Sequence, residues 1–66
     1  MFGLAIRRRR EALGLSQEKL AELADVHWTY VSRVEGAKQN LTLDMIVRFA
    51  SALDVRPSDL LRDGGL

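Results

Sequence analysis

Side chains that can form hydrogen bonds or stack gather within one short stretch of the sequence. They are Trp28, Thr29, Ser32 and Arg33. Because a helix turns about 100° per residue, these side chains share one face, on the far side from Val31. A polar and aromatic face of this kind is typical of a solvated surface helix, or of a helix that fits into a groove. The major groove of B-DNA, about 12 Å wide, is such a groove.

Each of these side chains offers a different contact to a base edge. Arg33 presents a guanidinium fork that matches guanine O6 and N7. Thr29 can touch a thymine methyl or bond a base edge, and Ser32 can do either more weakly. Trp28 has one donor and no acceptor, so it cannot bond adenine with two hydrogen bonds. It contacts a thymine methyl, lies against the sugar-phosphate wall, or is partly buried at the edge of the helix pair.

Two short helices joined by a turn are predicted to position this face. Apolar residues recur at the i, i+3 and i+4 offsets of helices with an inward stripe. The stripe consists of Leu20, Ala21, Leu23 and Ala24 in one helix and Val31 and Val34 in the next. The pattern breaks at Asp25, and Val26 can close the wedge between the helices. Helices joined by so short a turn approach closely, which the small side chain of Ala21 permits.

This arrangement resembles a known family, the lambda repressor and Cro-like proteins, also called the XRE family. The residues that match its helix-turn-helix pattern are Gln17, Leu20, Ala21, Ala24, Val26, Val31, Ser32, Val34 and Glu35. The run His27, Thr29, Tyr30, Val31, Ser32 is most similar to the controller proteins of restriction-modification systems. The resemblance covers Ile6 to Leu61. It implies an all-α, compact five-helix domain that binds a specific DNA sequence and regulates transcription.

The sequence departs from the family pattern at two positions. Asp25 stands where the family usually has the glycine of the turn, and aspartate adopts the left-handed conformation less readily than glycine. After the second helix of the motif the usual order is glutamate, any residue, glycine. Here Gly36 comes one place early, and Ala37 takes the glycine position. We therefore expect the turn to form at some cost in stability, and the helix exit to be adjusted between Gly36 and Lys38.

Polar residues around the base-reading face are predicted to contact the DNA backbone. They are Ser16, Gln17, His27, Tyr30, Lys38, Gln39 and Asn40. Gln17 lies in the first turn of its helix, where free N–H groups attract a phosphate, and the resemblance implies the same contact. Ser16 is also expected to be the N-cap of that helix. For His27 three roles are open: a helix cap, a phosphate contact or a base reader. Residues 38–40 either donate hydrogen bonds to phosphate or form a solvated loop.

The first helix carries a basic run, Arg7 to Arg10, that is either a phosphate footprint or a solvated face. Arg10 lies between Ile6 and Leu13 on the face predicted to point inward. A buried arginine needs a partner, and Glu35 is the carboxylate whose helical position also faces inward. We predict an Arg10–Glu35 ion pair, which the resemblance also implies. In the alternative, the aliphatic part of Arg10 is buried and its guanidinium reaches solvent.

Apolar patterns also define the other helices. The inward positions are Phe2, Ile6 and Leu13 in a first helix that ends at Gly14, and Leu43, Ile46, Val47, Ala50 and Leu53 in a fourth helix that begins after its N-cap, Thr42. A short last helix opens with Pro57 and carries Leu60 and Leu61. Residues 63–66 are expected to form a frayed tail.

The fourth helix and the segment after it are more apolar than one small core needs. The surplus residues are Met45, Phe49, Ala52, Val55 and Leu61, and they predict a homodimer interface. The alternative for Phe49 is a central place in the core. A two-fold dimer would hold two reading helices about 34 Å apart and would bind a roughly palindromic site.

Composition narrows the class of protein. The 66 residues make one domain with a net charge of +1 and no cysteine, which excludes disulfides and thiolate zinc sites. No apolar run approaches the roughly 18 residues of a membrane span, and no signal-peptide pattern opens the chain. We therefore expect a cytoplasmic protein with no cofactor, metal or membrane contact. A single histidine, with no phosphate loop and no paired carboxylates, argues against an enzyme.

The predicted function is that of a sequence-specific transcriptional regulator that binds double-stranded DNA as a homodimer. It resembles a restriction-modification controller protein, and it would act by repression or by contacting RNA polymerase. The rival hypothesis is a protein-binding module, such as an antitoxin or an adaptor, built from the same five helices. The affinity for random duplex DNA distinguishes the two hypotheses, because phosphate contacts make it fall steeply with rising salt.

Overall fold

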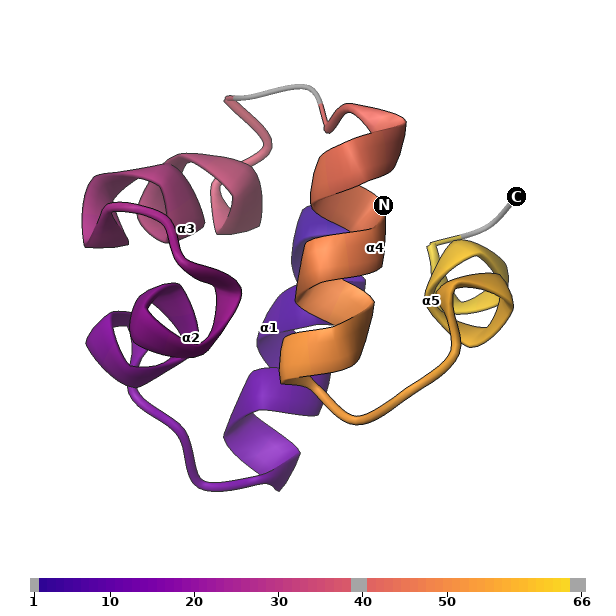
Figure 1. Cartoon of the computed structure of the whole chain (residues 1–66), viewed down its shortest axis with the longest axis horizontal. Helices are drawn as coiled ribbons and strands as arrows, with labels where there is room; N and C mark the ends of the chain where they lie inside the picture. The colour runs from indigo at the N-terminus through magenta and orange to yellow at the C-terminus, as the bar shows by residue number, and fades with distance from the viewer. Residues whose placement is uncertain (1, 39–40, 65–66) are drawn as a thin grey trace.

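The computed structural model describes residues 2–38 and 41–64, which form five helices and no strand. The helices are α1 (Phe2–Ala12), α2 (Gln17–Ala24), α3 (Trp28–Glu35), α4 (Leu43–Ala52) and α5 (Pro57–Asp63). In Figure 1, α1 and α4 lie in the middle of the molecule, with α2 and α3 on one side and α5 on the other. None of these helices is long and apolar enough to cross a bilayer. The all-α, five-helix fold predicted from the sequence is confirmed.

Local side-chain chemistry sets where the helices begin. Ser16 Oγ accepts a hydrogen bond from the Lys19 backbone N–H at 3.0 Å, and Thr42 Oγ1 accepts one from the Met45 backbone N–H at 3.2 Å. Both residues are therefore N-caps, as predicted. Pro57 is the first residue of α5, where its missing N–H leaves no hydrogen bond unmade.

Left-handed residues follow several of the helices. Gly14 ends α1 with a φ of 71°, and Asp25, Ala37 and Asp54 adopt φ values of 58°, 59° and 57° after α2, α3 and α4. The turn expected at Asp25 forms although the family's glycine is absent. Aspartate is one of the few other residues that enter this region routinely, because its short polar side chain can bond locally.

Every helix contributes to the core. The completely buried side chains are Ile6, Leu20, Val31, Phe49, Ala50 and Leu60. The Phe49 ring stacks on the Tyr30 ring, with 6.1 Å between ring centroids. The prediction that Phe49 belongs to a dimer interface is therefore wrong, and the alternative of a central place in the core is confirmed.

Four apolar residues predicted to point inward lie at the surface instead. They are Leu13, Leu23, Leu43 and Val47, with exposed fractions of 53%, 49%, 74% and 49%. Leu13 lies just past the last residue of α1, where the chain turns away toward Gly14. Leu23 and Val47 line a shallow groove between α2 and α4. Periodicity defines a wide apolar arc, but it does not say which part of that arc meets the core.

Gly3 allows α1 to approach the end of α3 closely. A Cβ atom at this position would overlap the carbonyl oxygen of Val34 and would lie 3.0 Å from the carbonyl oxygen of Glu35. The sequence pattern does not indicate this requirement, because a glycine within a helix usually indicates only a loss of helix stability. The contact places Arg7 and Arg10 of α1 beside the end of α3.

α5 lies against α1, and an ion pair links the two helices. Arg9 Nε donates a hydrogen bond to the Asp63 carboxylate at 2.8 Å. Asp63 is thus the last residue of α5 and not part of the tail predicted from residue 63; Gly65 and Leu66 lie outside the described residues. At the other end of α5, the Arg56 backbone N–H donates to the Asp59 carboxylate at 3.3 Å, which lowers the pKa of Asp59.

Candidate nucleic-acid interface

The outer face of α3 is accessible, as the sequence predicts. The side chain of Trp28 is 48% exposed. Thr29 and Arg33 are exposed, and Ser32 is partly buried. The apolar positions on the opposite face of α3 are buried, which fixes the rotation of the helix about its own axis. The predicted base readers therefore lie on one accessible side of the molecule, and their contact with DNA stays a prediction.

α3 begins at an uncommon N-cap, His27. The imidazole Nδ1 accepts a hydrogen bond from the Thr29 backbone N–H at 3.2 Å, and it lies 2.8 Å from the Thr29 hydroxyl oxygen. The imidazole ring also stacks on the indole of Trp28, with 6.1 Å between centroids and 30° between planes. Of the three roles considered for His27, the cap is the one that the structure contains.

α3 ends in a turn in which Ala37, and not Gly36, adopts the left-handed conformation. Gly36 has a φ of −84°, and Ala37 has a φ of 59°. The Ala37 N–H donates to the Val34 carbonyl at 3.1 Å, and the Lys38 N–H donates to the Arg33 carbonyl at 2.9 Å. This is the Schellman pattern, formed here at a cost of about 1–2 kcal/mol because alanine replaces glycine. The expected adjustment is therefore limited, and Lys38 stays close to the end of α3.

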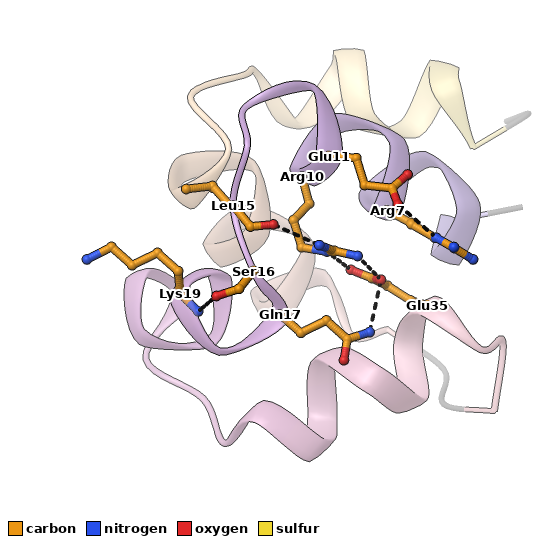
Figure 2. A network of polar contacts seen from close by, with 8 residues as sticks. All are labelled: Arg7, Arg10, Glu11, Leu15, Ser16, Gln17, Lys19 and Glu35. Carbon is orange, nitrogen blue, oxygen red and sulfur yellow. Dashed lines mark hydrogen bonds and ion pairs between the residues drawn. The ribbon is translucent and has the colours of Figure 1, made fainter.

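A largely buried ion pair joins the end of α3 to α1. Arg10 Nε donates to Glu35 Oε2 at 2.7 Å, and Arg10 Nη2 donates to Glu35 Oε1 at 3.0 Å. The two side chains are 11% and 4% exposed. Arg10 Nη1 donates to the Leu15 carbonyl oxygen at 2.7 Å (Figure 2). The hydrogen bond with Glu35 raises the pKa of Arg10. The predicted pair is confirmed, and the alternative in which Arg10 extends to solvent is wrong.

Gln17 brings the start of α2 into the same cluster. Its Nε2 donates to Glu35 Oε1 at 3.2 Å, and Figure 2 shows the side chain reaching from α2 toward the carboxylate. Glu35 therefore joins three helices through one side chain. One N–H of the Gln17 amide is used in this bond, so the other N–H and the backbone N–H groups of Gln17 and Glu18 remain for a phosphate.

Two shallow hollows lie along α3, and one of them is shared with α1 and α2. One is lined by Arg7, Arg10, Gln17, Ser32, Glu35 and Gly36, and the other by Ser32, Arg33, Gly36 and Lys38. We call the residues of these hollows other than the Arg10–Glu35 pair the polar strip. The charges of that pair offset each other, so the strip carries the positive charges of Arg33 and Lys38, together with that of Arg7, which Glu11 partly offsets. An anionic backbone lying along α3 would meet this charge.

The run Arg7–Arg10 does not form one basic patch, because each arginine points in a different direction around α1. Arg7, which pairs with Glu11 at 3.4 Å, lines the polar strip. Arg10 is buried in its ion pair. Arg8 and Arg9 line a pocket between α1 and α5 together with Asp63. Of the four arginines, Arg7 is therefore the one that can contact a phosphate beside α3. The sequence could have indicated this, because residues three apart on a helix are neighbours, and Arg10 was already predicted to face α3.

The other predicted backbone contacts have different surroundings. Ser16 caps α2, Lys38 is exposed, and Tyr30 is partly buried, with its ring against the core. Gln39 and Asn40 lie outside the described residues. Within residues 2–38 and 41–64, no three metal-ligating side chains come together. The residues gathered beside α3 thus offer hydrogen-bond donors and positive charge, which suit a phosphate and a base edge.

Comparisons with known proteins give the same picture. A family model described as helix-turn-helix matches residues 6–60. The control protein C.BamHI of Bacillus amyloliquefaciens is 44% identical over 62 residues, which are 92% of this chain and 76% of that protein. The crystal structure of the restriction-modification controller protein C.AhdI from Aeromonas hydrophila is similar, with a TM-score of 0.87 and 44% identity, and the match covers 89% of each chain.

A further solved structure is similar and contains DNA. It is the biofilm regulator SinR in complex with DNA, with a TM-score of 0.86 and 34% identity; the match covers 92% of this chain and 98% of that one. The resemblance seen in the sequence is confirmed, since the matched residues include the whole of α2 and α3. The chain therefore belongs to the helix-turn-helix family of sequence-specific DNA-binding transcriptional regulators.

Proposed function

We propose that the chain is a restriction-modification controller protein that binds a roughly palindromic operator as a homodimer. The observation that carries the proposal is the exposed face of α3, held at one end by the His27 cap and at the other by Glu35. Bound beside a promoter in the cytoplasm, the dimer represses transcription or recruits RNA polymerase. It needs no cofactor for either task and catalyses no reaction.

In this proposal, α3 lies in the major groove, and its exposed side chains contact bases. Arg33 bonds guanine O6 and N7. Thr29 and Ser32 contact a base edge or a thymine methyl, and Trp28 lies against a methyl or the sugar-phosphate wall. Arg7, Gln17 and Lys38 of the polar strip contact phosphates on either side and fix the position of α3.

The proposed dimer interface lies beside α4 and α5. It consists of the predicted residues other than Phe49, namely Met45, Ala52, Val55 and Leu61, which are partly buried and border the core. Covering them with a second copy would remove further apolar area from water at about 25 cal/mol per Å². A small chain gains stability from such an interface, because it buries a lower fraction of its surface than a large chain does.

Met45→Glu is expected to weaken the dimer, because it places a charge among apolar side chains at the interface. Leu43→Glu is the matched control. It adds the same charge in the same first turn of α4, at a side chain that is 74% exposed and points to the other side of the helix. Sedimentation equilibrium should show that Met45→Glu is monomeric at concentrations where Leu43→Glu is dimeric. Equal dissociation of both variants would contradict the assigned interface.

Arg33→Ala is expected to lose discrimination at one or two base pairs, at a cost of about 1–3 kcal/mol, while Gln17→Ala should weaken binding to all sequences alike. Selection from a random DNA pool gives the operator, and titrations of single-base variants measure both effects. Arg62→Ala removes the same charge from an exposed position on α5 and controls for net charge. If Arg33→Ala and Gln17→Ala weaken every site equally, the assignment of Arg33 to base reading is wrong.

The salt dependence of binding separates this proposal from a protein-binding module of the same fold. Each phosphate contact releases counterions, so the affinity for duplex DNA should fall linearly on a double-logarithmic plot against salt. Absence of binding to any duplex at low salt would exclude the operator-binding proposal. The antitoxin or adaptor hypothesis would then gain support.

A further inference from the structure

The contact between His27 and Thr29 caps α3 and also involves the Thr29 hydroxyl. One ring nitrogen, Nδ1, lies within hydrogen-bond distance of two groups of the same residue: the Thr29 backbone N–H at 3.2 Å and the Thr29 hydroxyl oxygen at 2.8 Å. Thr29 is also an exposed residue on the face of α3 that is proposed to enter the major groove. The protonation of Nδ1 therefore bears on how Thr29 can meet a base.

The backbone N–H fixes the roles of both side chains. A backbone N–H can only donate, so Nδ1 must accept, and the proton of the neutral imidazole must lie on Nε2. An Nδ1 without a proton cannot donate to the Thr29 hydroxyl, so the hydroxyl is the donor in this contact, and the two Thr29 donors share the single lone pair of Nδ1. The hydroxyl hydrogen thus points at His27, and the lone pairs of the Thr29 oxygen remain available to other partners.

We propose that His27 is a positioning residue that makes Thr29 a hydrogen-bond acceptor on the DNA-facing side of α3. This inference rests on the proposed function and makes it more specific. In the major groove the exocyclic amino groups of adenine and cytosine are donors, while guanine O6 and thymine O4 are acceptors. A Thr29 oxygen with its hydrogen already engaged bonds an amino group and is repelled by O6 and O4. The base opposite Thr29 is therefore adenine or cytosine.

A second consequence concerns the far side of the imidazole. With the proton on Nε2, this nitrogen is a donor that Thr29 does not use. Stacking against Trp28 limits the orientation of the ring. The donor is suited to a phosphate oxygen beside the groove, which agrees with the backbone contact predicted for His27 from the sequence.

The tautomer can be measured on the free chain, without DNA. Long-range nitrogen–proton correlation spectra distinguish the two ring nitrogens, and at a pH where the imidazole is neutral they should show the proton on Nε2. His27 is the single histidine of the chain, so the signal needs no assignment. A proton found on Nδ1 would overturn the inference and would leave the proposed function untouched.

Base discrimination tests the role itself. The wild-type chain should prefer an amino-bearing base at one operator position by about fivefold, the contribution of one net hydrogen bond. His27→Ala frees the hydroxyl to donate or accept, so this preference should disappear at that position while the other positions keep theirs. His27→Asn keeps an acceptor and is itself a favoured N-cap, so it should retain the preference. If His27→Asn behaves like His27→Ala, the acceptor is not what matters, and the inference fails.

Thr29→Val completes the test as a double-mutant cycle. Valine keeps the shape and the methyl group but has no hydroxyl, so the preference should be lost while the His27 cap on the backbone N–H remains. Adding His27→Ala to Thr29→Val should then change nothing further in base preference. A preference that survives in Thr29→Val would overturn the inference. If the wild-type chain did not bind DNA at all, the proposed function would be wrong. Failure of the inference and failure of the proposed function therefore give different results.

Discussion

Glu35→Ala is expected to destabilise the chain by up to about 3–5 kcal/mol, the cost of breaking a buried ion pair, because it leaves the largely buried guanidinium of Arg10 without its partner. A chain of this size has a free energy of unfolding of only about 3–10 kcal/mol. The loss therefore removes much or all of the stability. Arg10 and Glu35 are the least exposed members of the ion pairs described here, at 11% and 4%, and Gln17 loses an acceptor with the same substitution. Urea or thermal denaturation followed by circular dichroism measures the effect.

Two variants test the stated cause. Glu11→Gln breaks the exposed Arg7–Glu11 pair, whose side chains are 57% and 54% exposed, and should cost no more than about 0.5 kcal/mol. Arg10→Met combined with Glu35→Leu replaces both charges by apolar side chains and should recover most of the stability lost in Glu35→Ala. If Glu35→Ala were as mild as Glu11→Gln, burial of the Arg10 charge would not be the dominant effect.

Gly3→Ala is expected to cost about 3 kcal/mol, at the upper end for overpacking. The added Cβ meets backbone oxygens of Val34 and Glu35, which cannot rotate away as a side chain can. α1 must then move off the end of α3, which also strains the Arg10–Glu35 pair. Thermal denaturation should show a clear fall in the midpoint, although alanine is the better helix former.

Gly36→Ala is the matched control for Gly3→Ala. Its Cβ would also face a carbonyl oxygen, that of Ser32, but at 3.3 Å, and the φ of Gly36 is −84°. A shift of a few tenths of an ångström accommodates this contact, so the change in stability should be small. A similar loss in both variants would contradict a specific close approach at Gly3.

The sequence is sufficient to predict the fold and the accessible face of α3. Ser16, Thr42 and Pro57 are strong helix-start signals and lie where helices begin. The pairing of Arg10 with Glu35 also follows from the sequence, since a charge at an inward position needs a compensating charge.

Other features depend on tertiary packing and could not be predicted. The apolar arc of α4 includes both Phe49 and Val47, but only the position of the neighbouring helices decides that Phe49 is buried and Val47 exposed. The need for glycine at position 3 arises from the approach of α1 to another helix, which no local pattern records. The sequence leaves the cap as one of three roles for His27, which lies outside the usual capping residues, and only the hydrogen bonds in the structure single it out.

The attachment of α3 at both of its ends has a consequence for how sharply the chain selects its site. Glu35 fixes α3 to the helices that carry Arg7 and Gln17, so the proposed base contacts and phosphate contacts would move together as one rigid unit. Sliding by a single base pair, about 3.4 Å along the duplex, can restore the phosphate contacts, because the backbone repeats at every base pair, but it brings different base edges opposite α3. Neighbouring positions on the genome would thus be rejected by the base contacts, because α3 could not shift on its own to keep a partial fit.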